Sequence, residues 1–172
     1  GGANGIIVEN FGSAPFWKGD AASRIPPHQV AFMTRVVQEL CSRYALPIGV
    51  NCLRNDARAA LGIAAATGAA FIRVNVHTGA YLTDQGLIEG EAAESLRYRA
   101  SLGAAGVKIL ADVLVKHAAP LAPLSISDAV KDTLHRGCAD GVIVTGNATG
   151  GAVDEDALAE AVELELVVAH EA

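Results

Sequence analysis

A repeated joint between helix and strand is the feature that most constrains the fold of this chain. The joint is a glycine followed by small residues and a short Val- and Ile-rich run, and it occurs at Gly68, Gly103 and Gly137. Glycine suits a helix end because it adopts the left-handed conformation that closes the last turn. The β-branched runs after the joints predict buried strands. Strands that alternate with helices predict a parallel sheet and an α/β fold.

The predicted elements alternate along all 172 residues, a length that indicates a single domain. The predicted strands are Gly5–Glu9, Pro47–Asn51, Phe71–Asn75, Val107–Asp112 and Gly141–Thr145. The predicted helices are Pro27–Tyr44, Asp56–Thr67, Glu89–Leu102, Ser127–Arg136 and Asp154–Val168.

The composition argues against several classes of protein. Hydrophobic residues make up 51% of the chain, so it can bury a core, and the net charge of −6 without a basic run argues against a nucleic-acid partner. No apolar stretch reaches the roughly 20 residues that cross a bilayer, so we predict no transmembrane segment. Cys41, Cys52 and Cys138 lack C-x-x-C spacing, which indicates reduced thiols and a cytoplasmic protein.

Polar residues stand at the end of every predicted strand. They are Glu9, Asn10, Asn51, Asn75, Asp112 and Thr145. The carboxyl ends of all strands line the active site of a (β/α)8 barrel, whereas a doubly wound sheet binds ligands only where the strand order reverses. The pattern therefore favours a parallel TIM-type barrel. Because a complete barrel needs eight strands in about 250 residues, residues 1–172 are predicted to be one partial barrel domain, truncated at both ends.

Three residues near one strand end are candidates for catalysis. Asp112 closes its strand, and Lys116 and His117 follow in the next loop. A carboxylate, an amine and an imidazole so close in sequence suit general acid–base chemistry. The alternative is that Lys116 is solvated and His117 caps a turn.

Arg73 and Asn75 alternate along one strand, so both side chains point to the same face. A charge inside a barrel needs a partner or a ligand. Arg73 and Asn75 are therefore candidate ligand-binding residues, together with Asn10 and Asn51, and Glu9 joins the catalytic candidates. The alternative for Arg73 is a structural ion pair with Glu9 or Asp112.

Two loops carry further candidate ligand-binding residues. The segment Thr83–Gly90, with Asp84, Gln85 and Glu89, is long for a loop after a strand and suits a lid. Its alternative is a helix N-terminus.

The second loop follows the last predicted strand. Its Thr145, Gly146 and Asn147 precede a helix and suit anion binding. The alternative is a flexible glycine turn. No spacing indicates zinc, oxygen-rich strand ends suit Mg²⁺ without establishing a metal site, and the cofactor is unknown.

Seven segments carry a resemblance to a known family, in the same order along nearly the whole chain. They are Val8–Phe16, Gly49–Asp56, Phe71–Val76, Thr83–Gly90, Lys108–Val113, Val115–Pro120 and Ala139–Gly146. Together they resemble the BtpA/SgcQ family, which is named for a photosystem I biogenesis factor. The resemblance implies a ribulose-phosphate-binding-like barrel whose members begin one strand earlier. It also implies two later strands with a glycine-rich phosphate-type loop.

Two functions follow as hypotheses. The first is a barrel protein that binds or converts a small phosphorylated or sugar-like metabolite at its carboxyl-terminal mouth, of unknown reaction class. The second is a non-catalytic assembly or stability factor for photosystem I or another large complex. The second hypothesis predicts a large exposed apolar patch, and the sequence shows no such stripe outside the helices.

An open barrel also exposes strand edges. We expect Gly5–Glu9 and Gly141–Thr145 to be those edges, which makes the chain alone unstable or a homo-oligomer.

Overall fold

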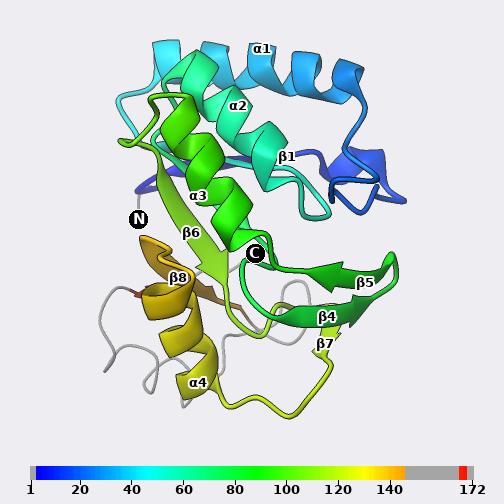
Figure 1. The fold of residues 1–172 in the computed structure, drawn as a ribbon. Coiled ribbons are helices and arrows are strands. Elements are labelled where there is room, and N and C mark those ends of the chain that lie inside the picture. Colours follow the sequence, from blue (N-terminus) through cyan, green and yellow to red (C-terminus); the bar gives the residue numbers. More distant parts are fainter. Residues whose placement is uncertain (1–2, 146–166, 170–172) are drawn as a thin grey trace. The chain divides into compact units, whose positions relative to one another are not determined.

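The structure is a computed structural model that describes residues 3–145 and 167–169. The chain divides into two compact units, drawn together in Figure 1. The first unit comprises Gly1–Val74 and Ala93–Ile109, and the second comprises Asn75–Ala92 and Leu110–Ala172.

The first unit contains parallel strands in sequence order. Strand β1 (Ile6–Glu9) pairs with β2 (Ile48–Asn51), which pairs with β3 (Phe71–Val74). The register places Glu9 beside Asn51 and Gly49 beside Phe71. Strand β2 is fully buried, whereas β1 is only half-buried and pairs with β2 alone among the described residues. The expectation that Gly5–Glu9 forms an edge is therefore met, and self-association through it stays a prediction.

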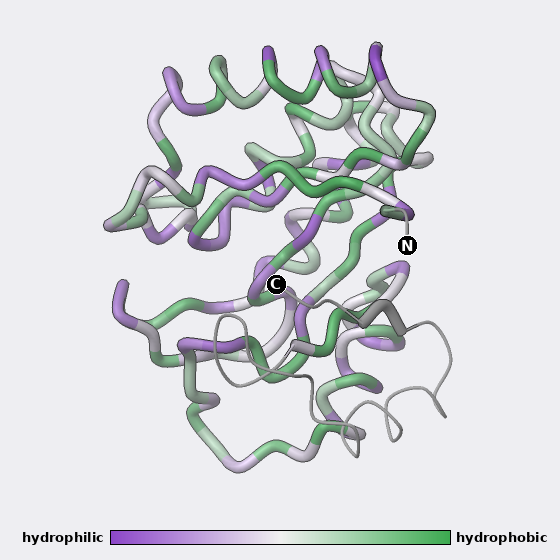
Figure 2. The backbone as a smooth tube through the Cα atoms, turned by 180° about the vertical axis from the view of Figure 1, so that it is seen from behind, coloured by the Kyte–Doolittle hydropathy of each residue, from purple (hydrophilic) through white to green (hydrophobic). Residues whose placement is uncertain are grey.

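Helices cover these strands. A 3-10 turn, η1 (Phe11–Ser13), follows β1. Helix α1 (Pro27–Arg43) packs against α2 (Ala57–Thr67), and α2 packs against β2 and β3. Figure 2 shows hydrophilic and hydrophobic stretches alternating along α1, the pattern of an amphipathic helix. Helix α3 (Ala92–Ser101) joins this unit from its second residue onward.

The left-handed glycine joints are confirmed at two of the three predicted positions. Gly68 has φ 76° and Gly103 has φ 65°, so each ends its helix in the conformation that glycine adopts without strain. Gly137 is different, because its φ is −79° and a π-helical turn ends there. An ideal Cβ on Gly137 would lie 2.6 Å from Thr78 Cγ2, so glycine is needed there for a close approach rather than for a left-handed turn.

Gly49 makes room for an aromatic ring on the neighbouring strand. A Cβ at this position would lie 2.2 Å from Phe71 Cε2. We expect Gly49→Ala to destabilise the protein by about 1–3 kcal/mol, because the ring must leave its packed position. Gly62→Ala is the matched control, since its nearest neighbour is Tyr98 Oη at 3.7 Å and alanine favours the helix. Urea unfolding of both variants measures the difference, and equal stabilities would contradict the expectation.

The second unit has a parallel set and a small antiparallel sheet. Strand β6 (Lys108–Asp112) begins in the first unit and pairs from Leu110 onward with β8 (Gly141–Val144), which pairs with β9 (Val167–Ala169). Helix α4 (Ile126–Lys131) continues into a π-helical turn, η2 (Asp132–Arg136). The core that joins them is made of Val113, Ala129, Val130, Val142 and Val144.

The antiparallel sheet has the strand order β5-β4-β7. Strand β4 (Ala80–Thr83) forms a hairpin with β5 (Gly86–Glu89) and also pairs with β7 (Ala118–Pro120). Figure 1 shows the three strands side by side. Tyr81 and Ile88 are buried on the inner face, against Val76 and Val115.

The hairpin corrects one sequence prediction. The segment Thr83–Gly90 is neither a long loop nor a helix start, because it contains the Asp84-Gln85 turn and strand β5. The predicted helix therefore starts at Ala92 and not at Glu89. The physical signal is the alternation of buried and exposed residues around Gly86, whose φ of 92° fits a hairpin turn.

The end of the chain corrects two more predictions. Val167 and Val168, predicted as the end of a helix, lie in strand β9. Because β9 pairs with β8, Gly141–Thr145 is not an open edge. The remainder of the predicted helix, residues 154–166, lies outside the described residues. The other strand predictions are confirmed within one residue or two, so the α/β class with parallel strands is confirmed, and closure into a barrel stays a prediction.

Candidate functional site

A polar row crosses the ends of three strands in the first unit. Asn51 Nδ2 donates a hydrogen bond to Glu9 Oε1 at 2.9 Å, and Arg73 Nη1 donates to the same oxygen at 3.2 Å. Arg73 is only 5% exposed, so its charge needs this carboxylate as a counter-ion. The ion pair with Glu9 that the sequence offered as one interpretation is therefore present. The three side chains form one charged, hydrogen-bonded group suited to holding a polar ligand.

Asn10 links two loops beside this row. Its Oδ1 accepts from Leu53 N at 2.7 Å, and its Nδ2 donates to Leu53 O at 3.1 Å and to Gln29 Oε1 at 3.2 Å. Both ends of the buried amide are thus engaged within the protein. Asn10 fixes the loop that follows β2, and a direct ligand contact for Asn10 stays a prediction.

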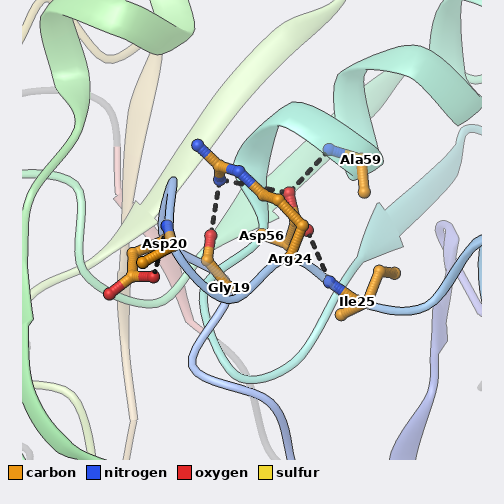
Figure 3. A network of polar contacts seen from close by, with 7 residues as sticks. Gly19, Asp20, Arg24, Ile25, Asp56 and Ala59 are labelled. Atoms are coloured by element: carbon orange, nitrogen blue, oxygen red, sulfur yellow. Dashed lines mark hydrogen bonds and ion pairs between the residues drawn. The ribbon is translucent and has the colours of Figure 1, made fainter.

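Asp56 is a buried carboxylate that the sequence analysis placed only at a helix start. Figure 3 shows its Oδ2 accepting from Ile25 N at 2.9 Å and its Oδ1 accepting from Ala59 N at 2.9 Å. Arg24 Nη1 lies 3.3 Å from Oδ1 and also donates to Gly19 O. The carboxylate therefore caps α2 and ties the loop before α1 to the loop before α2. An aspartate just before a helix signals the cap, but nothing in the sequence signals Arg24 as its partner.

The second unit has its own polar strand ends. Asn75 Nδ2 donates to Asp112 Oδ2 at 2.7 Å, and both residues are buried. Asn75 Oδ1 is fully buried without a hydrogen-bond partner within the described residues. Thr145 Oγ1 is likewise buried and has no hydrogen-bond partner there. Buried polar atoms are nearly always hydrogen-bonded. Asn75 Oδ1 is therefore available as an acceptor, and Thr145 Oγ1 as a hydroxyl, for a molecule that reaches either atom.

His77 and Thr78 were missed by the sequence analysis. His77 Nε2 lies 2.9 Å from Gly137 O, so this nitrogen carries the proton and donates. Thr78 Oγ1 lies 3.1 Å from Thr133 Oγ1. These contacts join the segment after β3 to the turn η2 within the second unit. The only sequence signal is a histidine just beyond a strand end.

The remaining predicted site residues lie on loops of the second unit. Lys116 is half-buried and His117 is exposed, both between β6 and β7. Asp84 and Gln85 form the hairpin turn, where Gln85 Nε2 donates to Asp84 Oδ2 at 2.6 Å, and Glu89 is exposed at the end of β5. Their contacts with a ligand stay a prediction. Gly146 and Asn147 lie outside the described residues.

Three further findings concern metal binding, membrane-spanning helices and the pKa of Tyr81. Within residues 3–145 and 167–169, no three His, Cys, Asp or Glu side chains gather closely enough to hold a metal ion. Among the helices that the structure describes, none is long and apolar enough to cross a membrane. Burial raises the pKa of the Tyr81 hydroxyl, although a hydrogen bond with the backbone of Leu114 opposes the rise.

Cys52 is protected from chemistry by its surroundings. Burial raises the pKa of its thiol strongly, and the negative charge of Asp56 adds to the rise. We expect iodoacetamide at pH 8 to alkylate the exposed Cys138 in the native protein and to leave Cys52 unmodified, because only a thiolate reacts. Peptide mass spectrometry after a short exposure tests this. Modification of Cys52 at the rate of Cys138 would contradict it, and alkylation in urea shows that both thiols are detectable.

A family model and a curated relative agree on the family to which this chain is similar. The model of the BtpA family matches residues 1–170. The chain is 56% identical to the photosystem I biogenesis protein BtpA of Synechocystis sp., over 87% of this chain and 50% of that protein. It is 47% identical to an uncharacterized protein of Pyrococcus furiosus, over 88% of this chain and 55% of that protein. It is 34% identical to an uncharacterized mitochondrial protein of Caenorhabditis elegans, over 95% of this chain and 60% of that protein.

The chain spans about half the length of the first curated relatives that it matches. Among solved structures, it is similar to the apo form of the 3-keto-D-glucoside 4-epimerase YcjR of E. coli, with a TM-score of 0.47 and 16% identity. That match covers 91% of this chain and 68% of the epimerase.

Proposed function

Because this chain belongs to the BtpA family, we propose that it is part of a (β/α)8 barrel that binds a small phosphorylated or polyhydroxylated metabolite. The ligand binds at the carboxyl ends of the parallel strands, where barrels of this type carry their active sites. Closure of the barrel requires further strands, and the relatives are long enough to contain them.

One observation carries the proposal. Asn75 is 3% exposed, its amide nitrogen is bound to Asp112, and its Oδ1 has no partner within the described residues. Leaving such an acceptor unsatisfied costs about 1–3 kcal/mol. A ligand or an ordered water that donates a hydrogen bond to the oxygen removes this cost. A hydroxyl group of a sugar or polyol is a donor of the right kind.

Each of the two units has its own strand-end residues. In the first unit, Arg73 and Asn51 share Glu9 and suit recognition of a phosphate or hydroxyl group. In the second unit, Asp112 is the proposed proton acceptor, held in orientation by Asn75. Lys116 and His117 follow on the next loop and are proposed to assist it. The reaction class stays open.

A thermal-shift screen tests the proposal. The full-length protein is melted with sugar phosphates, free sugars and inorganic phosphate, and we expect at least one compound to raise the melting temperature in a saturable way. Arg73→Lys is the informative variant, because it keeps a positive charge but loses the planar fork that binds phosphate. Arg136→Lys, at an exposed ion pair, is the matched control. No shift with any compound would reject metabolite binding.

A second function is favoured by two separate observations. The relative with 56% identity is named as a photosystem I biogenesis protein. In addition, Leu82, Leu87 and Leu121 are exposed, and Leu82 and Leu87 are paired across β4 and β5. Whether these leucines amount to the large apolar patch that an assembly factor needs stays a prediction. A role as an assembly factor would use this face of the small sheet as a docking surface.

Co-purification separates the two functions. Capture of a photosystem protein that is lost in a Leu82→Ser, Leu87→Ser variant, without a thermal shift from any metabolite, would favour the assembly factor. The relative in a nematode, an animal without photosystems, argues against a photosystem-specific role as the one that all family members share.

A further inference from the structure

Aromatic side chains gather on the segment that follows β1. Phe11, Phe16 and Trp17 lie within seven residues of one another, in a chain that has four phenylalanines and one tryptophan. The rings of Phe11 and Phe16 are 6.2 Å apart between centroids and tilted by 54°. Phe11 is 65% exposed and Trp17 is 52% exposed. Aromatic side chains that gather on one exposed segment indicate a binding role, because ligand sites are lined mainly by apolar and aromatic side chains.

The backbone that carries these rings is held firmly. Trp17 O accepts a hydrogen bond from Arg54 N at 2.9 Å. Two residues later, Gly19 lies so close to the loop before α2 that a Cβ would be 2.4 Å from Asp56 N. Arg24 then ties Gly19 O to Asp56, as Figure 3 shows. The aromatic segment is therefore anchored before any ligand arrives, which lowers the entropic cost of binding.

The polar partners of such a surface belong to the same unit. Phe11 follows Glu9 by two residues, and Glu9 is part of the polar row with Asn51 and Arg73. An exposed aromatic ring two residues along the chain from a fixed polar group suits one chemical class in particular. A pyranose or furanose ring presents C–H groups on one face and hydroxyl groups around its edge.

We propose that Phe11, Phe16 and Trp17 form a stacking surface for the C–H face of a cyclic sugar or cyclic sugar phosphate. This inference rests on the proposed metabolite function and narrows it, because acyclic polyol phosphates lack the flat face. The ring stacks on the aromatic groups, and its hydroxyl groups bond to the strand-end polar row.

The chain's one tryptophan makes the inference directly measurable. Trp17 emission is recorded while the full-length protein is titrated with D-glucose, D-ribose, D-glucose 6-phosphate, glycerol 3-phosphate and inorganic phosphate. If the full-length protein contains other tryptophans, they are replaced by phenylalanine, so that only Trp17 contributes to the measured emission. We expect a saturable emission change with at least one ring compound and none with glycerol 3-phosphate or inorganic phosphate.

A matched pair of variants tests the aromatic contribution. Phe11→Ala should weaken ring-sugar binding about tenfold, the loss expected for one stacked aromatic side chain. Phe32→Ala is the control, because Phe32 is 64% exposed on α1 and lies outside the aromatic segment. Thermal melts of both variants confirm that each is folded. Equal sugar affinities for the two variants would overturn the proposal.

The outcomes separate this inference from the function on which it rests. A thermal shift with glycerol 3-phosphate or inorganic phosphate, without any change in Trp17 emission, would keep the metabolite site and reject the stacking surface. No response to any ring compound would reject the stacking surface as well. A protein partner whose capture depends on Phe11, in a protein that binds no sugar, would assign the aromatic segment to protein recognition and reject the sugar site.

Discussion

Asp56→Ala should destabilise the protein by about 3 kcal/mol or more, one of the two largest effects expected here. The substitution removes the cap of α2 and leaves Ile25 N and Ala59 N without their acceptor. It also leaves Arg24 without its carboxylate. A cap alone contributes about 1 kcal/mol, and the buried hydrogen bonds to a charged group account for the rest. Urea unfolding followed by circular dichroism measures the change.

Two further variants make the Asp56 result specific. Asp56→Asn keeps one acceptor for the helix cap but loses the charge, so we expect an intermediate loss. Asp132→Ala removes an exposed ion pair with Arg136 and should change stability by less than about 0.5 kcal/mol. If Asp56→Ala were as mild as Asp132→Ala, the two loops would not depend on this carboxylate.

Asp112→Asn should lower turnover by about 10²–10⁴-fold for any compound that the full-length protein converts, if Asp112 is the general base. The amide keeps the size of the carboxyl group and accepts from Asn75 in its place, so the fold should survive. What it loses is the ability to take a proton. The measurement is the rate of conversion of the compound that gives the largest thermal shift.

The matched control for this variant is Asp128→Asn, an exposed residue at the start of α4. Its rate should equal that of the unmodified protein. An Asp112→Asn protein that melts normally and retains full turnover would remove Asp112 from the chemistry. Binding of the compound is checked separately, because a lost thermal shift would indicate a recognition role instead.

The parallel strands were predictable because their signals are local. Each of the five predicted strands, β1, β2, β3, β6 and β8, is a short β-branched run, and three of them (β3, β6 and β8) begin after a glycine joint. Helix α2 was predictable at both ends, from Asp56 before it and Gly68 after it. The same local reasoning failed at Gly137, where a close approach to Thr78 and not a left-handed turn requires glycine.

The hairpin was missed because its strands, Ala-Tyr-Leu-Thr and Gly-Leu-Ile-Glu, lack the Val- and Ile-rich run that marks the other strands. A turn such as Asp84-Gln85-Gly86 also fits a helix start when it is read without its partner strand. Strand β9 was missed because it pairs with β8, which is distant in the sequence, and this pairing leaves no local signal in the residues of β9.

The candidate site was predictable in its residue types but not in its pairings. Polar residues at strand ends identified Glu9, Asn51 and Arg73, and the alternation along a strand placed Arg73 on the shared face. The anchoring contacts were not predictable, because Arg24 and Asp56 are 32 residues apart and meet only after both loops fold. The unsatisfied oxygen of Asn75 likewise has no sequence signal, since it depends on where every neighbouring donor lies.

The most direct test of a metabolite site at the strand ends is a crystal structure of the full-length protein with the compound that stabilises it most. The account predicts a hydroxyl or other donor of that compound about 2.7–3.2 Å from Asn75 Oδ1, with Asp112 beside the same group. Density for the compound away from every strand end, with Asn75 Oδ1 bound only to a protein donor, would contradict it.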